Sequence, residues 1–346
     1  MKYTKEYWED VSRVVNNIPD IKKIFGKRVL ITGGTGMVCS AIIDTVIWLN
    51  KECDAGIKLI LAGRSLDKIN DRFKDVLTKQ DFDYISYDAT TQQSIDVRAD
   101  YIIHGASNAN PAIFSKEPVE TLVGNIIGLD SILKVARNNE GARLLYISSS
   151  EVYGNRSDGS NTPYKENDYG FVDILNPRAS YPNGKRAAET LCVSYGQEYG
   201  VDTVIVRLGH IYGPSITKSD TRASASFTRD VADKHDIVMK SPGAQLRSYC
   251  YTLDCASAIL TVLLNGATGE AYNISNRDSI ASIRDIAEAL AQAGKVKVVF
   301  ENPTDIEKKS YNLMDNSALD SEKLERLGWK AEFLLSEGTE KTIWFY

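Results

Sequence analysis

The sequence predicts an α/β protein built around a doubly wound parallel sheet. From residue 27 to Pro214, short apolar runs alternate with segments of helical periodicity, and a glycine-rich turn follows the first run. This alternation is typical of strands and helices that build a parallel sheet. We expect strands at 28–31, 57–62, 84–87, 101–104, 144–148 and 202–207, and helices at 37–50, 66–77, 121–138 and 181–199.

The pattern changes on both sides of this region. Residues 1–26 begin with apolar side chains at helical spacing, which predicts an appended amphipathic helix that packs on the outside of the fold. Residues 27–213 form the first domain of the prediction. Residues 214–346 are less regular, and we expect them to form mainly a smaller α+β domain. The two domains should be interleaved, with part of 250–280 returning to the first.

Composition argues against several classes of partner. The 346 residues carry a net charge of −5 with both signs mixed, which gives no electrostatic footprint for nucleic acid or an anionic membrane. The longest apolar stretch, around 256–264, is far too short for a membrane span. The scattered cysteines lack C-x-x-C spacing, which argues against a metal site or a disulfide framework and favours the cytoplasm. These are Cys39, Cys53, Cys192, Cys250 and Cys255.

A glycine turn joins the first expected strand to the helix after it. In T-G-G-T-G (32–36), Gly33 permits a tight turn, and Gly36 lets the backbone approach a pyrophosphate at the positive end of the helix. This strand–turn–helix context predicts a Rossmann domain that binds a dinucleotide. The second strand is followed by Arg64 rather than an acid, which favours the 2′-phosphate of NADP over NAD. The alternative is an arginine that stacks on adenine.

A serine, a tyrosine and a lysine form a candidate catalytic set. The fifth expected strand leads to Ser149, and Tyr181 and Lys185 open the helix at 181–199. Residues four apart share one helical face. A lysine cation beside a phenol favours the ionised phenol, which would make Tyr181 a base near neutral pH. Ser149 could then bond the same substrate hydroxyl.

These motifs resemble those of the extended short-chain dehydrogenase/reductase family, and within it the NAD(P)-dependent nucleotide-sugar epimerases, dehydratases and decarboxylases. The resemblance covers about residues 27–346 and includes R-L-G-H-I-Y-G-P (207–214) and L-G-W (327–329). It implies that Ser149, Tyr181 and Lys185 are the catalytic triad. The family usually has a third glycine where this chain has Cys39, a small thiol that should be tolerated with a slight shift.

The resemblance also implies residues for two ligands, NAD(P) and a nucleotide-diphosphate sugar. For the sugar substrate it implies Ser150, Arg222, Arg247 and His210, which stands where relatives usually carry asparagine. Arg247 matches an arginine that contacts the substrate diphosphate, which a guanidinium suits. For the cofactor it implies Gly33, Thr35, Gly36, Met37, Val38, Arg64, Ser65, Asp88, Ala89, Gly105, Ala106, Ser107, Asn125, Tyr181 and Lys185.

A homodimer is implied by the same resemblance. The segments 121–138 and 181–199 match the helix pair that forms a four-helix interface in many relatives. Obligate interfaces of this kind are large and apolar.

The reaction type stays open between several alternatives. The family's shared chemistry removes a hydride from a sugar carbon, usually C4, while the tyrosine takes the hydroxyl proton. We expect an epimerase/dehydratase-type enzyme that oxidises and re-reduces its sugar with a retained cofactor. The alternatives are an NADPH-dependent reductase of a nucleotide-linked keto sugar, a UDP-glucuronate decarboxylase-like enzyme, and a non-catalytic NAD(P)-binding regulator. Glu151 serves either as a further catalytic acid/base or only fixes the strand end.

Overall fold

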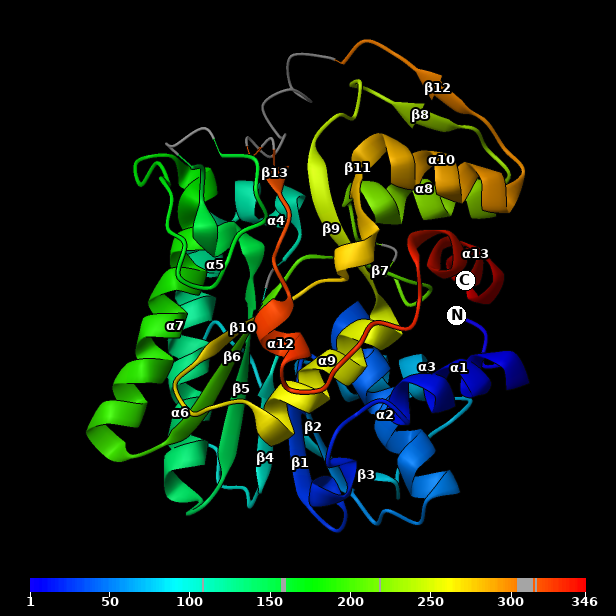
Figure 1. Ribbon diagram of the computed structural model, residues 1–346. Helices are drawn as coiled ribbons and strands as arrows, with labels where there is room; N and C mark the ends of the chain where they lie inside the picture. Colours follow the sequence, from blue (N-terminus) through cyan, green and yellow to red (C-terminus); the bar gives the residue numbers. More distant parts are fainter. Residues whose placement is uncertain (108, 157–159, 218, 304–313, 315) are drawn as a thin grey trace.

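Seven parallel strands form the centre of the protein in a computed structural model that describes residues 1–107, 109–156, 160–217, 219–303, 314 and 316–346. Their order is β10-β6-β5-β4-β1-β2-β3 (Figure 1). The chain leaves β1 toward one edge of the sheet and then builds the other, which confirms the expected Rossmann-like sheet. The strands are β1 (Arg28–Thr32), β2 (Lys58–Gly63), β3 (Phe82–Ser86), β4 (Tyr101–His104), β5 (Arg143–Ser149), β6 (Asp202–Leu208) and β10 (Ala271–Ile274).

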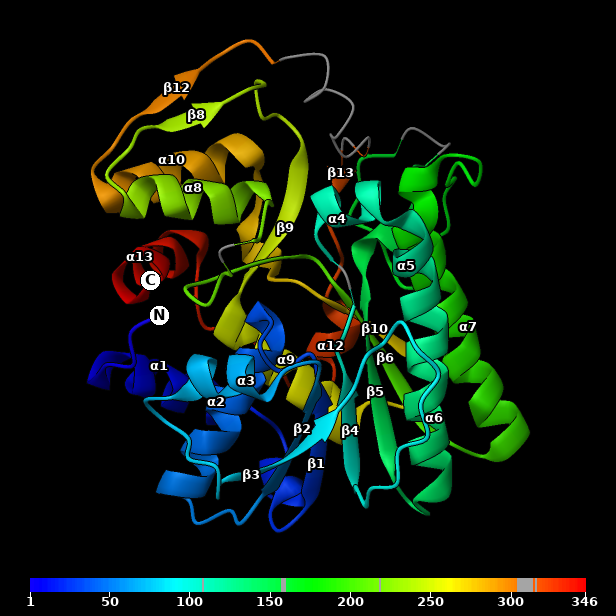
Figure 2. The same cartoon turned by 180° about the vertical axis from the view of Figure 1, so that it is seen from behind.

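Helices cover both faces of this sheet (Figures 1 and 2). Successive strand residues point to opposite faces, so Val29 and Ile31 join the core under α2 and α9, whereas Leu30 joins the core under α6 and α7. Among the described residues, none of the helices is long and apolar enough to cross a membrane. One layer holds α2 (Met37–Glu52), α3 (Leu66–Phe73) and α9 (Thr252–Asn265), and the other holds α5 (Pro118–Val123), α6 (Leu129–Asn138) and α7 (Ser180–Tyr199).

Two expected helices differ in their extent. The helix expected at 66–77 ends at Phe73, whose carbonyl accepts hydrogen bonds from the Val76 and Leu77 amides in a closing turn. The helix expected at 121–138 is interrupted by a π-helical turn at Gly124–Gly128. Within this turn the Asn125 side-chain amide donates to the carbonyl of Thr121 at 2.8 Å and occupies an acceptor of the helical backbone. Single π turns inside helices often mark functional sites.

A smaller sheet lies above the carboxyl ends of the main strands. Its central strand β9 (Leu246–Tyr251) pairs with β7 (His210–Tyr212), β11 (Ile280–Ser282) and β13 (Asn316–Ser317). Between β9 and β11 the chain returns to the main sheet through α9 and β10. Beside the smaller sheet lie β8 (Ile237–Met239), β12 (Val298–Phe300), α8 (Ala223–Ala232), α10 (Ile283–Gly294) and α13 (Leu335–Phe345). The short helix α4 (Pro111–Lys116) packs against α5, and α12 (Glu322–Glu325) packs against β10.

The N-terminal helix α1 (Lys5–Val15) connects the two ends of the chain. Tyr3 and Tyr7 donate hydrogen bonds to the buried carboxylate of Asp44 on α2, at 2.8 and 2.7 Å. On its other side, Asp10 accepts a hydrogen bond from Lys341 of α13 at 2.8 Å. The helix therefore packs on the outside of the main sheet's helical layer, and both termini lie close together in Figure 1.

Candidate active site

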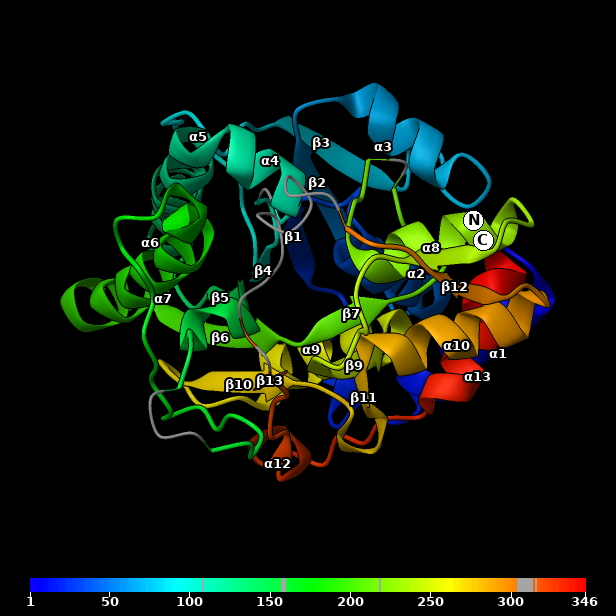
Figure 3. The same ribbon diagram turned by 90° about the horizontal axis from the view of Figure 1, so that it is seen from above.

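The dinucleotide pocket lies at the carboxyl ends of the main strands. Figure 3 looks down on this edge, where β1 and β4 lie between α4 and the strands of the smaller sheet. The pocket brings together most of the expected cofactor residues: Gly33, Thr35, Arg64, Ser65, Asp88, Ala89, Ala106, Ser107 and Asn125. The expected residues outside its lining are Gly36, Met37, Val38, Gly105, Tyr181 and Lys185.

Several lining residues were missed by the sequence reasoning. Lys68 lies one turn into α3, away from the end of β2 where the arginine was expected. The others follow β3 or belong to α5, and the shared edge of a parallel sheet was the signal that could have found them. The missed polar and aromatic lining residues are Lys68, Tyr87, Thr90, Glu120 and Thr121.

The glycine turn leaves room that a side chain would fill. Gly33 has φ +74°, and a Cβ there would lie 2.9 Å from the amide nitrogen of Ala106. Cys39 stands where the family usually has its third glycine, and its side chain is accommodated because residue 105 is a glycine. Its buried sulfur lies 3.6 Å from the carbonyl oxygen of Thr32, and a Cβ on Gly105 would collide with it. The cysteine and Gly105 therefore share one small space.

A buried threonine–histidine pair fixes the ends of β1 and β4. Thr32 Oγ1 accepts hydrogen bonds from the amides of Gly105 and Ala106, each at 3.1 Å, and lies 2.9 Å from His104 Nδ1. Burial, with a smaller contribution from Lys185, lowers the pKa of His104 to about 3. The imidazole is therefore neutral at pH 7, and this network holds the backbone of the cofactor turn in one conformation.

Asn125 connects the pocket with the catalytic strand. Its Oδ1 accepts hydrogen bonds from Ser107 at 3.0 Å and from the Tyr146 hydroxyl at 3.2 Å. With its Nδ2 held by the carbonyl of Thr121, the amide has a single orientation. The π-helical turn thus positions a fixed polar group between the pocket and β5.

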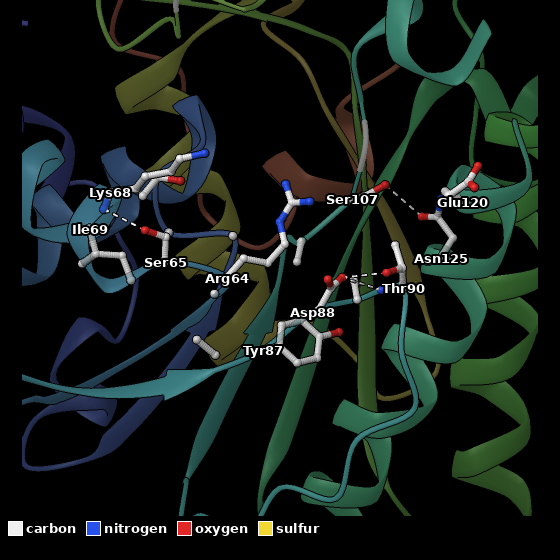
Figure 4. Close-up of a pocket in the computed structure, with 18 of the residues that line it drawn as sticks. Arg64, Ser65, Lys68, Ile69, Tyr87, Asp88, Thr90, Ser107, Glu120 and Asn125 are labelled. Atoms are coloured by element: carbon white, nitrogen blue, oxygen red, sulfur yellow. Dashed lines mark hydrogen bonds between the residues drawn. The ribbon is translucent and has the colours of Figure 1, made fainter. Parts of the chain in front are cut away.

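Two cationic side chains line the adenosine end of the pocket. Arg64 extends from the end of β2 into the middle of the pocket, above Asp88 (Figure 4). Ser65 caps α3 by accepting a hydrogen bond from the Lys68 amide at 3.3 Å, which makes Lys68 part of the first turn. Arg64 and Lys68 therefore bring two positive charges to the pocket lining, which also contains the carboxylates of Asp88 and Glu120.

The candidate triad lies next to the pocket. Ser149 ends β5 and lies close enough to the phenol of Tyr181, on the first turn of α7, to lower the pKa of that phenol. The ammonium of Lys185 donates to the carbonyl of Ile147 at 2.7 Å and lies 4.7 Å from the centre of the Tyr146 ring. It lies 5.8 Å from the centre of the Tyr181 ring. The structure therefore brings the three expected residues together.

The electrostatics of this set correct one expectation. Burial, and then the charge of Glu151, raise the pKa of Tyr181 to about 12, although Ser149, Arg222 and Arg178 act in the opposite direction. Burial also lowers the pKa of Lys185 to about 7. The expected fall of the phenol pKa toward neutrality is therefore wrong for the protein without ligand. The reason is that loss of water on burial is the largest influence on the pKa of both groups.

Glu151 is held in a fixed position near Tyr181. Its carboxylate accepts two hydrogen bonds from Arg178, at 3.0 and 3.3 Å, and its amide donates to Ser149 Oγ at 3.2 Å. Arg178 also lies 5.2 Å from the ring centre of Phe114, which stacks on the Tyr181 ring at 5.1 Å. Ser150, between Ser149 and Glu151, is buried in this turn. A carboxylate, a cation and an aromatic wall thus surround the phenol.

Three of the four residues expected to bind substrate, His210, Arg222 and Arg247, lie near one another, whereas Ser150 lies in the turn with Glu151. His210 on β7 and Arg247 on β9 lie on neighbouring strands; Arg247 is buried and His210 is half-buried. Burial and the charges of Arg247 and Arg222 lower the pKa of His210 to about 3, and its Nδ1 has no hydrogen-bond partner among the described residues. Arg222 is paired with Asp220, with two contacts of 3.0 and 3.1 Å from its Nε. Guanidinium groups around a neutral imidazole fit an anionic ligand.

Metal ligands do not gather in this site. Across the described residues, no group of three or more His, Cys, Asp and Glu side chains could hold a metal ion.

Comparison with known proteins decides the family. Residues 29–275 match the NAD dependent epimerase/dehydratase family. The chain belongs to this family. UDP-glucuronic acid decarboxylase 6 of Arabidopsis thaliana is 30% identical over 90% of this chain and 86% of its own length. UDP-glucuronic acid decarboxylase 1 of Xenopus tropicalis is 29% identical over 92% of this chain and 72% of its own length. The chain is therefore an enzyme of the epimerase/dehydratase type.

Solved structures show the same fold in family members. An epimerase of Methanothermobacter thermautotrophicus superposes with a TM-score of 0.78 at 20% identity, covering 95% of this chain and 94% of that one. A dTDP-glucose 4,6-dehydratase of Streptomyces venezuelae, solved with NAD bound, has a TM-score of 0.76 at 20% identity, covering 92% and 96%. In this epimerase/dehydratase the cradle at Gly33, which a Cβ would fill, and the N-terminus of α2 fit a dinucleotide.

The shared space of Cys39 and Gly105 makes a testable prediction. Gly105→Ala should destabilise the fold by about 1–3 kcal/mol, because the added methyl group overpacks against the Cys39 sulfur. Chemical denaturation measures this loss, and titration with NAD measures the accompanying loss of affinity. Cys39→Ala/Gly105→Ala should recover most of both, because the sulfur is removed. Equal losses in the single and double variants would contradict the coupling.

Proposed function

We propose that this enzyme acts on a nucleotide-diphosphate sugar, which it oxidises at C4 and re-reduces with the same NAD(P) molecule. The observation that carries the proposal is the position of Ser149, Tyr181 and Lys185 between two sets of ligand-binding groups. Lys185 lies over Tyr146, which bonds Asn125 of the dinucleotide pocket. Tyr181 lies close enough to Arg222 for the two charges to interact. The names of relatives that act on UDP-glucuronic acid support the same substrate class.

Each catalytic side chain has a role that its contacts support. The phenolate form of Tyr181, which the positive charges of Lys185 and of an oxidised nicotinamide would favour over the neutral phenol, takes the proton of the sugar hydroxyl, and Ser149 hydrogen-bonds the same oxygen. Lys185, held by the Ile147 carbonyl, binds the cofactor ribose and supplies a nearby positive charge. When bound, oxidised nicotinamide supplies the hydride acceptor. Arg247 and Arg222 bind the diphosphate, with His210 as a neutral neighbour.

Glu151 determines which step comes after the oxidation. A 4-keto group makes the neighbouring C–H bonds more acidic, and a carboxylate beside the phenol can act there as an acid/base. Its two hydrogen bonds from Arg178 hold the carboxylate in one orientation. A decarboxylase-like reaction is the second candidate, favoured by the similarity to UDP-glucuronic acid decarboxylases. A structural role for Glu151 would instead leave a simple epimerase.

Removal of the proposed base tests this function. Across a panel of nucleotide sugars, wild-type protein should convert at least one, and Tyr181→Phe should reduce its turnover by at least about a hundredfold, the usual contribution of a positioned acid/base. Calorimetry should find cofactor binding nearly unchanged. Tyr169→Phe removes the same atom from a side chain that is 81% exposed and should be fully active. Full activity of Tyr181→Phe would show that the base is another group.

We also propose that the cofactor is NADP rather than NAD. Arg64 and Lys68 line the pocket where the 2′-phosphate would lie, and Ser65 adds a hydroxyl. Charge-assisted hydrogen bonds to a phosphate are about twice as strong as neutral ones.

Calorimetric titration tests the cofactor preference. NADP(H) should bind more tightly than NAD(H). Arg64→Ala and Lys68→Ala should each weaken NADP binding roughly tenfold and change NAD binding much less. Equal affinities in the wild type, unaffected by Arg64→Ala, would rule out a phosphate contact at this position.

A homodimer through α5, α6 and α7 is our third proposal. Val119 and Leu122 of α5 are 66% and 38% exposed, and Val193 of α7 is 46% exposed. These apolar side chains lie on two helices that pack against each other. A second copy of the chain would cover them.

We also propose the cytoplasm as the compartment, because all five cysteines are unpaired.

Light scattering tests the dimer. The wild type should be a dimer at micromolar concentration, and Val193→Asp should be a folded monomer, because it puts a charge into the apolar interface. Val299→Asp changes an equally apolar residue on β12, far from these helices, and should stay dimeric. A wild-type monomer would contradict the proposal.

A further inference from the structure

A partly buried carboxylate, that of Glu189, lies on the same helix as Tyr181 and Lys185. Glu189 follows Tyr181 and Lys185 on α7 at the same four-residue spacing, which puts the three side chains along one face of the helix. Ser148, next to the catalytic serine, donates a hydrogen bond to Glu189 Oε1 at 2.5 Å. Arg207 on β6 donates two hydrogen bonds to the same carboxylate, from Nε to Oε1 at 3.1 Å and from a terminal nitrogen to Oε2 at 2.7 Å.

The sheet determines this arrangement. Ser148 on β5 and Arg207 on β6 are directly paired in the register of neighbouring strands, so both reach the same point of α7. Arg207 is 7% exposed and is held further by the hydroxyl of Tyr153 at 3.0 Å and the carbonyl of Glu166 at 2.7 Å. The Glu189 carboxylate is therefore held in place by hydrogen bonds from Ser148 and Arg207.

Glu189 is the one carboxylate that raises the pKa of Lys185 among the described residues. Burial lowers the pKa of Lys185, and Glu189 is the largest influence in the opposite direction. Cys192 and Cys39 have smaller effects, but burial raises the pKa of both thiols, so they are neutral at pH 7. On the facing strands, His104 is neutral and Tyr146 presents its ring.

We infer that Glu189 is a positioning residue of the active site, which balances the Lys185 ammonium and is itself held by Arg207 and Ser148. This inference rests on the proposed function, in which Lys185 acts as a cation. Activity that needs charged Lys185 is lost as the pH rises through the pKa of this lysine. Replacing Glu189 by a neutral residue lowers that pKa, so the loss moves to lower pH.

A stability effect alone cannot test the inference, because Glu189→Gln also leaves Arg207 buried without its partner. The double variant Glu189→Gln/Arg207→Gln removes that unpaired charge and should recover part of the thermal stability. It still lacks the anion beside Lys185, so the lysine should stay as easily deprotonated as in the single variant. A merely structural role predicts that stability and titration recover together. Glu198→Gln, an exposed site on the same helix, is the matched control.

The titration of Lys185 can be followed without turnover. Full-length protein labelled with [ε-13C]lysine gives one NMR resonance that is lost in Lys185→Met, and its wild-type midpoint should lie near pH 7. Glu189→Gln and the double variant should both lower this midpoint by about one pH unit or more, and the alkaline limit of activity should move with it. The inference would be overturned if either the single or the double variant titrated at the wild-type midpoint. The expected shift without turnover of any nucleotide sugar would instead refute the proposed function.

Discussion

The burial of one cation, Lys185, sets the conditions for the whole site. Only 3% of this residue is exposed, and loss of water is the largest influence on its pKa. The ammonium is stabilised by the carbonyl of Ile147, the face of the Tyr146 ring and the carboxylate of Glu189. Two of these groups come from β5 and one from α7. The packing of α7 on β5 therefore decides whether the lysine can act as a cation at neutral pH.

The same packing connects the catalytic side chains with the dinucleotide pocket. Gly184, one residue before Lys185, has no side chain where α7 passes the π-helical turn, and a Cβ there would lie 3.3 Å from Asn125. Tyr146 lies under Lys185 and donates a hydrogen bond to the same Asn125. A shift of α7 away from β5 would therefore disturb the lysine, the phenol and the pocket wall together. The polar groups at the carboxyl ends of the main strands therefore depend on one another for their positions.

Local patterns in the sequence were enough to predict much of the fold and to select Ser149, Tyr181 and Lys185, which lie together in the structure. The alternation of strands and helices and the turn at Gly33 predicted the sheet and the pocket, and the spacing of Tyr181 and Lys185 predicted their common face. These features depend on residues that are close in the chain. The positions of the expected site residues agree with a single ligand-binding edge, and their roles stay predictions.

The features that could not be predicted depend on contacts between distant segments. Phe114, far from α7 in the chain, stacks on Tyr181, and burial of this kind raises the phenol pKa rather than lowering it. The pairing of Arg178 with Glu151 and the shared space of Cys39 and Gly105 also need the folded structure. No local pattern reports how much water a side chain loses on folding, which is why the direction of the Tyr181 pKa was wrong.

The most direct test of a retained cofactor is a count of NADPH molecules used per molecule of nucleotide sugar converted. The near-ultraviolet absorbance of reduced nicotinamide measures the first quantity, and chromatography of the nucleotide sugars measures the second. We expect wild-type protein to convert many equivalents of sugar without added NADPH and with no net change in absorbance. Consumption of one NADPH per product, with no conversion in its absence, would contradict the retained-cofactor mechanism and identify the enzyme as a reductase.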